Sequence, residues 1–173
     1  MLHSINELQE INMLLSEQAY KKIDKELAKY PADQRQSAVM AALRIAQEEK
    51  GWVSDEVIVD VAEYLGMPTI AVQEVATFYD MYELKPVGKY KLTVCTNLPC
   101  ALRDGEKTAH YISEKLGIAI GETTPDGLIT LQESECQGAC GDAPVLLINN
   151  HHMCVRMSKE RIDELLADIQ SEG

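Results

Sequence analysis

The chain has 173 residues, of which 46% are hydrophobic and 25% are charged, a composition typical of folded globular domains. It carries 28 acidic and 16 basic residues, and the formal net charge of −12 argues against binding to nucleic acids or anionic membranes. No apolar run approaches the roughly 20 residues that span a bilayer, and the N-terminus lacks the layout of a secretion signal. We therefore expect a cytoplasmic protein without direct membrane insertion.

The first half of the sequence predicts four amphipathic helices and no strand. Serine caps, acidic first turns, and glycine or proline stops mark their ends. In chain order, the helices are expected from Ser16 to Pro31, over Gln36–Lys50, from Ser54 to Gly66, and from Pro68 along an apolar stripe of Ala71, Val75, Phe78 and Tyr82. The last two would suit a helix-turn-helix DNA reader, but the acidic residues on both favour a plain helical hairpin.

The apolar periodicity changes after Lys85–Lys89, which we take as a break between two domains. The elements expected beyond it are a strand at Tyr90–Cys95, a helix at Glu106–Leu116, strands at Gly127–Gln132, Val145–Asn149 and Met153–Met157, and a helix after Ser158. This order is that of a thioredoxin-like domain, with the first two strands parallel and the next two an antiparallel hairpin. The fold class is therefore α+β (α/β-type), with an N-terminal helical bundle over residues 1–86 and a thioredoxin-like domain over 87–173.

Four of the five cysteines fall in two short-range pairs, Cys95-x4-Cys100 and Cys136-x3-Cys140. A disulfide framework is not expected in a chain without a secretion signal, because the cytosol keeps thiols reduced. The first pair follows the first strand and the second pair follows the second strand. In a parallel strand–helix–strand unit both loops emerge at the same edge of the sheet. The four thiolates are therefore expected to converge near the surface.

Three kinds of chemistry compete for these cysteines. A [2Fe–2S] cluster takes two thiolates on each of two tetrahedral irons, and the sequence supplies two pairs. A structural zinc module of four cysteines tolerates the same spacings, although no Cys-x2-Cys pair occurs. Redox disulfides of the thioredoxin type would require that missing spacing. Spacing alone favours the cluster only slightly over zinc. Gly138 and Gly141, however, suit backbone N–H groups that approach cluster sulfurs.

The remaining candidate ligands have plainer interpretations. Cys154, on the last expected strand, is interpreted as a small buried hydrophobe. His151 and His152 lie at a turn tip, where a solvated surface is the expected environment, and neither His3 nor His110 has a ligand partner at suitable spacing. The sequence contains no G-x-G-x-x-G and no P-loop, so no dinucleotide site and no catalytic residue is predicted.

Several segments in both halves match a known family. They are Val94–Cys100, Glu135–Cys140 with Ala143–Pro144, Ala46–Trp52, Val75–Tyr79 and Pro86–Tyr90. On these segments the chain resembles the 24-kDa, or E, subunits of NADH–quinone oxidoreductase, respiratory complex I. The matching segments are distributed over nearly the whole chain.

The resemblance implies a thioredoxin-like [2Fe–2S] ferredoxin domain whose cluster ligands are Cys95, Cys100, Cys136 and Cys140. Cys95 and Cys100 are then expected on one iron, and Cys136 and Cys140 on the other. The helical segment would clasp the flavin-carrying, NADH-binding subunit (F, 51-kDa type), in which NADH reduces FMN close to the cluster. The chain would be an electron carrier in the peripheral arm of complex I, held to the inner membrane through the complex. Small diaphorase subunits of NAD-linked hydrogenases and formate dehydrogenases share the signature and stay open as alternatives.

Overall fold

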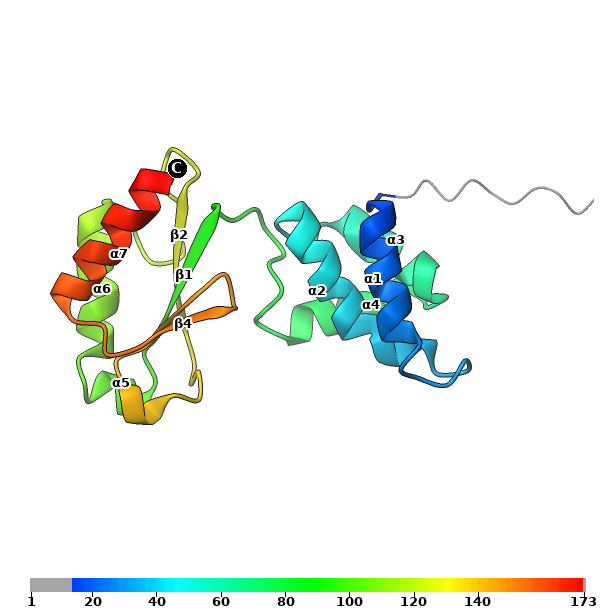
Figure 1. Cartoon of the computed structure of the whole chain (residues 1–173), viewed down its shortest axis with the longest axis horizontal. Coiled ribbons are helices and arrows are strands. Elements are labelled where there is room, and N and C mark those ends of the chain that lie inside the picture. Colours follow the sequence, from blue (N-terminus) through cyan, green and yellow to red (C-terminus); the bar gives the residue numbers. More distant parts are fainter. Residues whose placement is uncertain (1–13, 173) are drawn as a thin grey trace, which may run out of the picture. The chain divides into compact units, whose positions relative to one another are not determined.

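A computed structural model of the chain describes residues 14–172, so His3 lies outside the described residues. The chain divides into two compact units, with the boundary between Pro86 and Val87. One unit consists of helices, and the other combines a sheet with helices (Figure 1). Within the described residues, every helix is too short or too polar to traverse a lipid bilayer.

The first unit contains the four predicted helices. They are α1 (Glu17–Leu27), α2 (Val39–Lys50), α3 (Asp55–Leu65) and α4 (Thr69–Phe78), with a 3-10 turn, η1 (Arg35–Ala38), directly before α2. The predicted serine caps are confirmed. Ser16 Oγ accepts a hydrogen bond from the backbone N–H of Ala19 at 3.2 Å, and Ser54 Oγ accepts one from Val57 at 3.3 Å. Gly66 ends α3 in the left-handed conformation, as expected of a helix stop.

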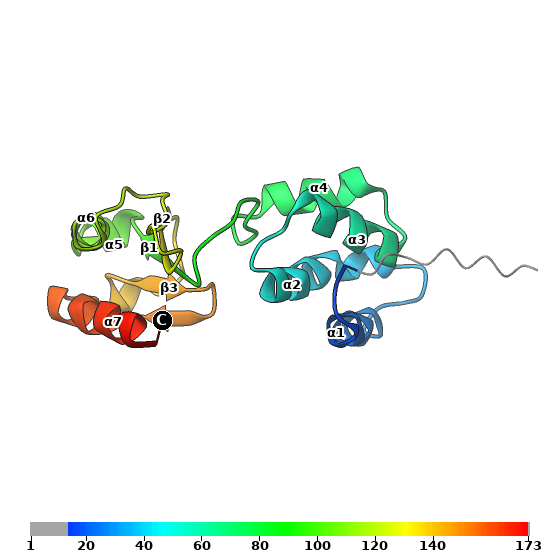
Figure 2. The same cartoon turned by 90° about the horizontal axis from the view of Figure 1, so that it is seen from above.

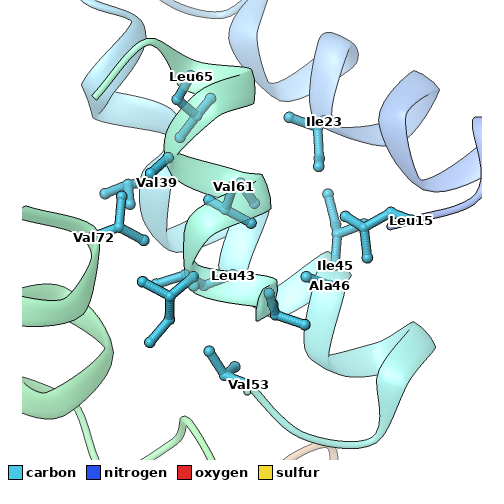
Figure 3. Packing of buried hydrophobic residues seen from close by; sticks show 14 of the residues in the cluster. Leu15, Ile23, Val39, Leu43, Ile45, Ala46, Val53, Val61, Leu65 and Val72 are labelled. Atoms are coloured by element: carbon cyan, nitrogen blue, oxygen red, sulfur yellow. The ribbon is translucent and has the colours of Figure 1, made fainter. Parts of the chain in front are cut away.

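The helices of this unit share one apolar core (Figure 3). Ile23 of α1, Leu43 of α2 and Val61 of α3 are at most 1% exposed. A polar contact lies beside them, where the Tyr20 hydroxyl donates to the carboxyl oxygens of Asp60 at 2.7 and 2.8 Å. Asp60 is only 5% exposed, so this pairing satisfies a polar group that would otherwise be costly to bury.

The predicted apolar stripe of α4 is wrong at Phe78, whereas Val75 packs against the core as expected. The helix buries Val72 and Ala76, whereas Phe78 is 79% exposed. Tyr82 lies beyond the end of the helix and is nevertheless buried, and its hydroxyl donates to the carbonyl of Met40 at 2.8 Å. The helix is apolar on several faces, so its sequence does not determine which face packs inward.

The second unit is built on a four-stranded mixed sheet in the order β2-β1-β3-β4. The strands are β1 (Tyr90–Cys95), β2 (Ile129–Ser134), β3 (Leu146–Ile148) and β4 (His152–Cys154). β1 pairs in parallel with β2 and antiparallel with β3, and β3 and β4 form a hairpin. The predicted parallel pair and antiparallel hairpin are therefore confirmed.

Two long helices, α6 (Gly105–Leu116) and α7 (Lys159–Glu172), lie on the same side of this sheet in both views (Figures 1 and 2). Ala109 and Ile112 of α6 and Ile162 of α7 pack in one core with Leu92 of β1 and Leu131 of β2. The alternation of Leu92 with the polar residues beside it turns one face of β1 toward the helices. This packing fixes the edge of the sheet at which the cysteine loops begin.

Several boundaries in this unit differ from the prediction by a few residues. β2 begins two residues later than expected, and β4 ends at Cys154 instead of Met157. Arg156 has a φ of 53°, a left-handed conformation that a strand cannot accommodate, so the chain turns away there. A short helix, α5 (Leu98–Ala101), was not predicted, because four residues are too few to show a helical period.

Candidate metal centre

The carboxyl ends of β1 and β2 lie side by side. Cys95, the last residue of β1, is in register with Ser134, the last residue of β2. The parallel ladder continues for one more bond, from the N–H of Thr96 to the carbonyl of Ser134 at 3.2 Å. The loops that carry the two cysteine pairs therefore leave the sheet at the same edge, as the sequence predicted.

The first loop holds its two cysteines in the interior of the unit. Cys95 is 2% exposed and Cys100, on α5, is 1% exposed. Val145 is tied to both: its carbonyl accepts from the N–H of Cys95 at 3.1 Å, and its own N–H donates to the Cys100 sulfur. Gly105 lies against this loop, where an added Cβ would be 2.8 Å from the carbonyl oxygen of Cys95. Only glycine allows α6 to approach so closely.

The second loop presents its two cysteines to the surface. Cys136 lies just after β2, Cys140 begins the 3-10 turn η2 (Cys140–Asp142), and both are exposed. Their sulfurs are 3.7 Å apart. The N–H of Gly138, whose φ is +80°, donates to the Cys136 sulfur at 3.4 Å. This bond is of the kind that the glycines around the second pair predicted.

The four thiols form one connected group. The Cys100 thiol contacts that of Cys95 and lies within electrostatic range of Cys140, which in turn interacts with Cys136 and Cys95. Burial, followed by the contact with Cys95, raises the pKa of the Cys100 thiol. The contact with Cys136, followed by a smaller effect of desolvation, raises the pKa of the exposed Cys140 thiol. Thiolates at these positions would repel one another, and this repulsion is relieved by bound metal cations.

Polar side chains that the motif analysis did not single out join the two loops. Asn97 caps α5, because its Oδ1 accepts from the N–H of Leu98 at 3.0 Å, while its Nδ2 donates to Glu135 Oε2 at 2.5 Å. Gln137 Nε2 donates to the carbonyl of Thr93 at 2.8 Å and so holds the second loop against β1. The capping role of Asn97 could have been predicted, because asparagine is a preferred residue at helix N-termini. The partners of both side chains depend on the tertiary fold.

The arrangement of the thiols in two pairs fits a two-iron cluster. Two thiolates that bind one tetrahedral ion at about 2.3 Å lie roughly 3.8 Å apart, and the Cys136–Cys140 separation of 3.7 Å meets that requirement. The donors are all soft sulfur atoms, which suit iron–sulfur clusters and also zinc.

The other candidate ligands lie on β4, at the hairpin turn before it and on α6. Cys154 is partly buried on β4, opposite Leu146 of β3, and burial raises the pKa of its thiol. His151 and His152 are exposed at the hairpin turn, and His110 is exposed on α6. The interpretation of these four residues as non-ligands stays a prediction.

Comparison with known proteins identifies the kind of domain that carries the thiols. The model of the thioredoxin-like [2Fe–2S] ferredoxin family matches residues 23–170, a range that contains all four cysteines. The chain belongs to this family. The thioredoxin-like [2Fe–2S] ferredoxin fold that the order of elements and the resemblance predicted is thereby confirmed.

Relatives with similar sequences are components of NADH-quinone oxidoreductases. The protein named subunit 2 of that enzyme in Thermus thermophilus is 40% identical over 149 residues, which cover 86% of this chain and 82% of the relative. The E subunit from Rickettsia conorii is 40% identical over 147 residues, covering 84% and 87%. An E subunit from Rhizobium meliloti is 39% identical over 149 residues, covering 86% and 87%. The predicted resemblance to E subunits is confirmed.

A solved structure with a similar fold is the NAD+-reducing [NiFe]-hydrogenase in its air-oxidized state. The TM-score is 0.69 at 21% sequence identity, and the match covers 83% of this chain but only 24% of the hydrogenase chain. The present chain thus spans about a quarter of the length of that protein. At this level of identity the likeness concerns the fold alone.

Proposed function

We propose that this chain is the [2Fe–2S] electron-transfer component, of the E type, in an NADH–quinone oxidoreductase. The observation that carries the proposal is the convergence of Cys95, Cys100, Cys136 and Cys140 at one edge of a [2Fe–2S] ferredoxin fold. The relatives that align along most of its length bear the name of that enzyme. The chain is an electron carrier, and the oxidoreductase activity belongs to the assembled complex.

The two loops supply one pair of ligands each. We assign Cys95 and Cys100 to one iron and Cys136 and Cys140 to the other. When bound, the cluster supplies one-electron chemistry between ferric and ferrous iron. The N–H of Gly138 stabilises negative charge on the Cys136 sulfur. Burial of the first pair excludes water from one side of the site, and exposure of the second pair leaves the other side accessible to a redox partner.

The helical unit is proposed to dock on the flavin-carrying, NADH-binding subunit of the F, or 51-kDa, type. That partner would hold FMN and NADH and would join this chain to the peripheral arm on the cytoplasmic side of the inner membrane. Support comes from α4, where Ile70 is 63% exposed and Phe78 is 79% exposed. Large apolar side chains on one short helix are typical of an interaction surface.

A diaphorase subunit of an NAD-linked hydrogenase is the second candidate, and the fold likeness to the NAD+-reducing hydrogenase favours it. Such a subunit, or that of a formate dehydrogenase, would use the same four ligands. Co-purification from the native organism distinguishes these hosts. Recovery of the flavin subunit with quinone-reductase components supports the first proposal, whereas recovery with hydrogenase or formate-dehydrogenase components contradicts it.

The cluster itself is tested on anaerobically purified protein. We expect a reddish-brown protein with iron and acid-labile sulfide in equal amounts, and a paramagnetic signal that develops only after reduction. Cys136→Ser and Cys140→Ser should each reduce iron content and alter that signal. A colourless protein with one zinc per chain would refute the electron-transfer function and support a structural zinc module.

Docking is tested with a surface variant of the full-length chain. Ile70→Ser combined with Phe78→Ser removes the exposed apolar side chains of α4, while the buried residues of the helix stay intact. This variant should keep its cluster and lose co-purification with the flavin subunit. Val59→Ser on α3, at a position that is 41% exposed, is the matched control. Unchanged co-purification of the double variant would exclude this face of α4.

A further inference from the structure

The second unit contains a pocket of about 400 Å³ that the electron-transfer function does not use. It lies where the beginning of α6, the turn after Cys140 and the beginning of α7 meet, and Ala143, Pro144, Met157 and Ile162 supply its apolar lining. Its volume is in the range of small-molecule sites, roughly 300–1,000 Å³. A ligand of modest size could therefore be held there.

Basic side chains dominate the charged lining of this pocket. Four of them contribute: Arg103, Lys107, Arg156 and Lys159. Two are already paired, because Lys107 binds Asp104 and Arg156 binds Asp142, each at 2.6 Å.

The other two basic residues supply a surplus of positive charge. Within the described residues, no carboxylate forms an ion pair with Arg103 or Lys159. Lys159 Nζ instead lies 5.0 Å from the centre of the Tyr111 ring. The nearby carboxylate of Asp163 is bound by Lys115 at 2.9 Å. Lys159 also lies within electrostatic range of the carboxylates of Glu160 and Asp163. The lining nevertheless contains four basic residues against one acidic residue, Asp104, in a chain whose net charge is −12.

We propose that this pocket binds a small dianion, of the phosphate or dicarboxylate class. The excess of basic over acidic side chains in the lining favours a ligand with negative charge, and arginine presents a fork of N–H donors that suits phosphate and carboxylate oxygens alike. Because the net charge of the chain is −12, its overall electrostatic field repels anions. An anion that binds in this pocket is therefore held by contacts with the lining residues.

The pocket adjoins both of the loops that carry the cysteine pairs. Arg103 follows Cys100 by three residues, and Gly141 directly follows Cys140. A bound dianion adds negative charge beside this site. If the proposed cluster is present, its reduction adds one more electron to the same neighbourhood, so the dianion shifts the reduction potential to more negative values.

Binding is measured by calorimetry on the full-length, cluster-loaded protein at low ionic strength, with inorganic phosphate in one arm and succinate in the other. We expect one site per chain for at least one of these probes. Arg103→Gln and Lys159→Gln should each weaken binding by about tenfold, the effect of one charge-assisted hydrogen bond. Lys107 and Arg156 are left unchanged because each already binds a carboxylate.

Lys21→Gln is the matched control, because it removes the same charge from a side chain that is 72% exposed on α1. Absence of binding by both probes would overturn the proposal, as would binding that neither pocket variant weakens. The reduction potential, measured with and without the bound probe, tests the coupling separately. An unchanged potential would refute the coupling but not the dianion site, and neither result depends on the identity of the host complex.

Discussion

The side-chain amide of Asn97 donates a hydrogen bond to the carboxylate of Glu135 at 2.5 Å, across 38 residues of sequence. Asn97 lies between Cys95 and Cys100, and Glu135 directly precedes Cys136. The bond thus joins the two loops that carry the proposed ligands. Since the same Asn97 side chain also caps α5, it couples the position of Cys100 to that of the second loop.

Asn97→Ala should destabilise the second unit and loosen the proposed cluster. Loss of the cap and of the bond to Glu135 should lower the free energy of unfolding by about 1–2 kcal/mol. Cluster release to an iron chelator should become faster, because the loops lose their connection. Urea unfolding and the decay of cluster absorbance measure the two effects.

Asn97→Asp separates the two roles of this side chain. Aspartate keeps the oxygen that caps α5 but replaces the amide donor by a carboxylate that repels Glu135. It should release the cluster at least as fast as Asn97→Ala does. Cluster lifetimes equal to that of the unsubstituted chain in both variants would show that the bond between the loops has no role in holding the centre.

Gly105→Ala should disturb the first cysteine loop through a steric clash. The new Cβ would lie 2.8 Å from the carbonyl oxygen of Cys95 and 2.9 Å from backbone atoms of Cys100. Backbone atoms cannot move away as a flexible side chain can, so we expect a cost of about 1–3 kcal/mol. Iron content per chain and the midpoint of thermal unfolding measure the result.

Gly141→Ala is the control for this substitution, because Gly141 adjoins the other cysteine loop but an added Cβ there meets no atom within 4 Å. It should leave iron content unchanged. Equal loss of iron in the two variants would mean that the space around Gly105 is not the reason for its effect.

Local chemistry made much of the fold predictable. Ser16 and Ser54 are helix caps because their hydroxyl oxygens accept hydrogen bonds from backbone N–H groups in the first turn. This interaction depends on only a few neighbouring residues. The strand at Tyr90–Cys95 was predicted to the residue. The convergence of the cysteine loops followed from the parallel strand pair, since parallel strands end at the same edge of a sheet.

Features that depend on distant partners were not predictable. The inward face of α4 is set by packing in the helical unit, because the helix is apolar around much of its circumference. Two hydrogen bonds join segments about 40 residues apart: Asn97 to Glu135 and Gln137 to Thr93. No periodic pattern in the sequence predicts such contacts. The assignment of the four cysteines to two irons stays a prediction that spectroscopy must test.

Cys154→Ser should leave the cluster spectrum unchanged. The residue lies on β4, paired with Leu146, and does not belong to the connected group of four thiols. Absorbance and the paramagnetic signal of the reduced protein should match those of the unsubstituted chain, whereas Cys136→Ser should alter both. Loss of the cluster on substitution of Cys154 would mean that a ligand has been assigned wrongly.

Tyr20→Phe should destabilise the helical unit by about 2–3 kcal/mol, because it removes the donor that pairs with the buried Asp60 carboxyl group. Tyr64→Phe is the control, since the Tyr64 hydroxyl donates to Asp24 at 2.7 Å in an exposed position. Its cost should stay below about 1 kcal/mol. The rings of Tyr20 and Tyr64 contact each other, with centroids 4.6 Å apart, and both substitutions keep this contact. Chemical denaturation therefore isolates the effect of the hydroxyl groups. Equal costs would contradict the role assigned to Asp60.

The same unit should lose stability in alkaline solution. Burial raises the pKa of Tyr64 and of Tyr82 to about 12, and burial together with Asp60 raises that of Tyr20 further. Unfolded tyrosine has a pKa of about 10. The unfolded chain therefore binds fewer protons than the folded chain above about pH 10, and the free energy of unfolding falls as pH rises. Urea titrations from pH 8 to 11 should give a constant value up to about pH 10 and a decline beyond it. Tyr82→Phe should make that decline shallower, and a decline of unchanged slope would show that this tyrosine does not contribute.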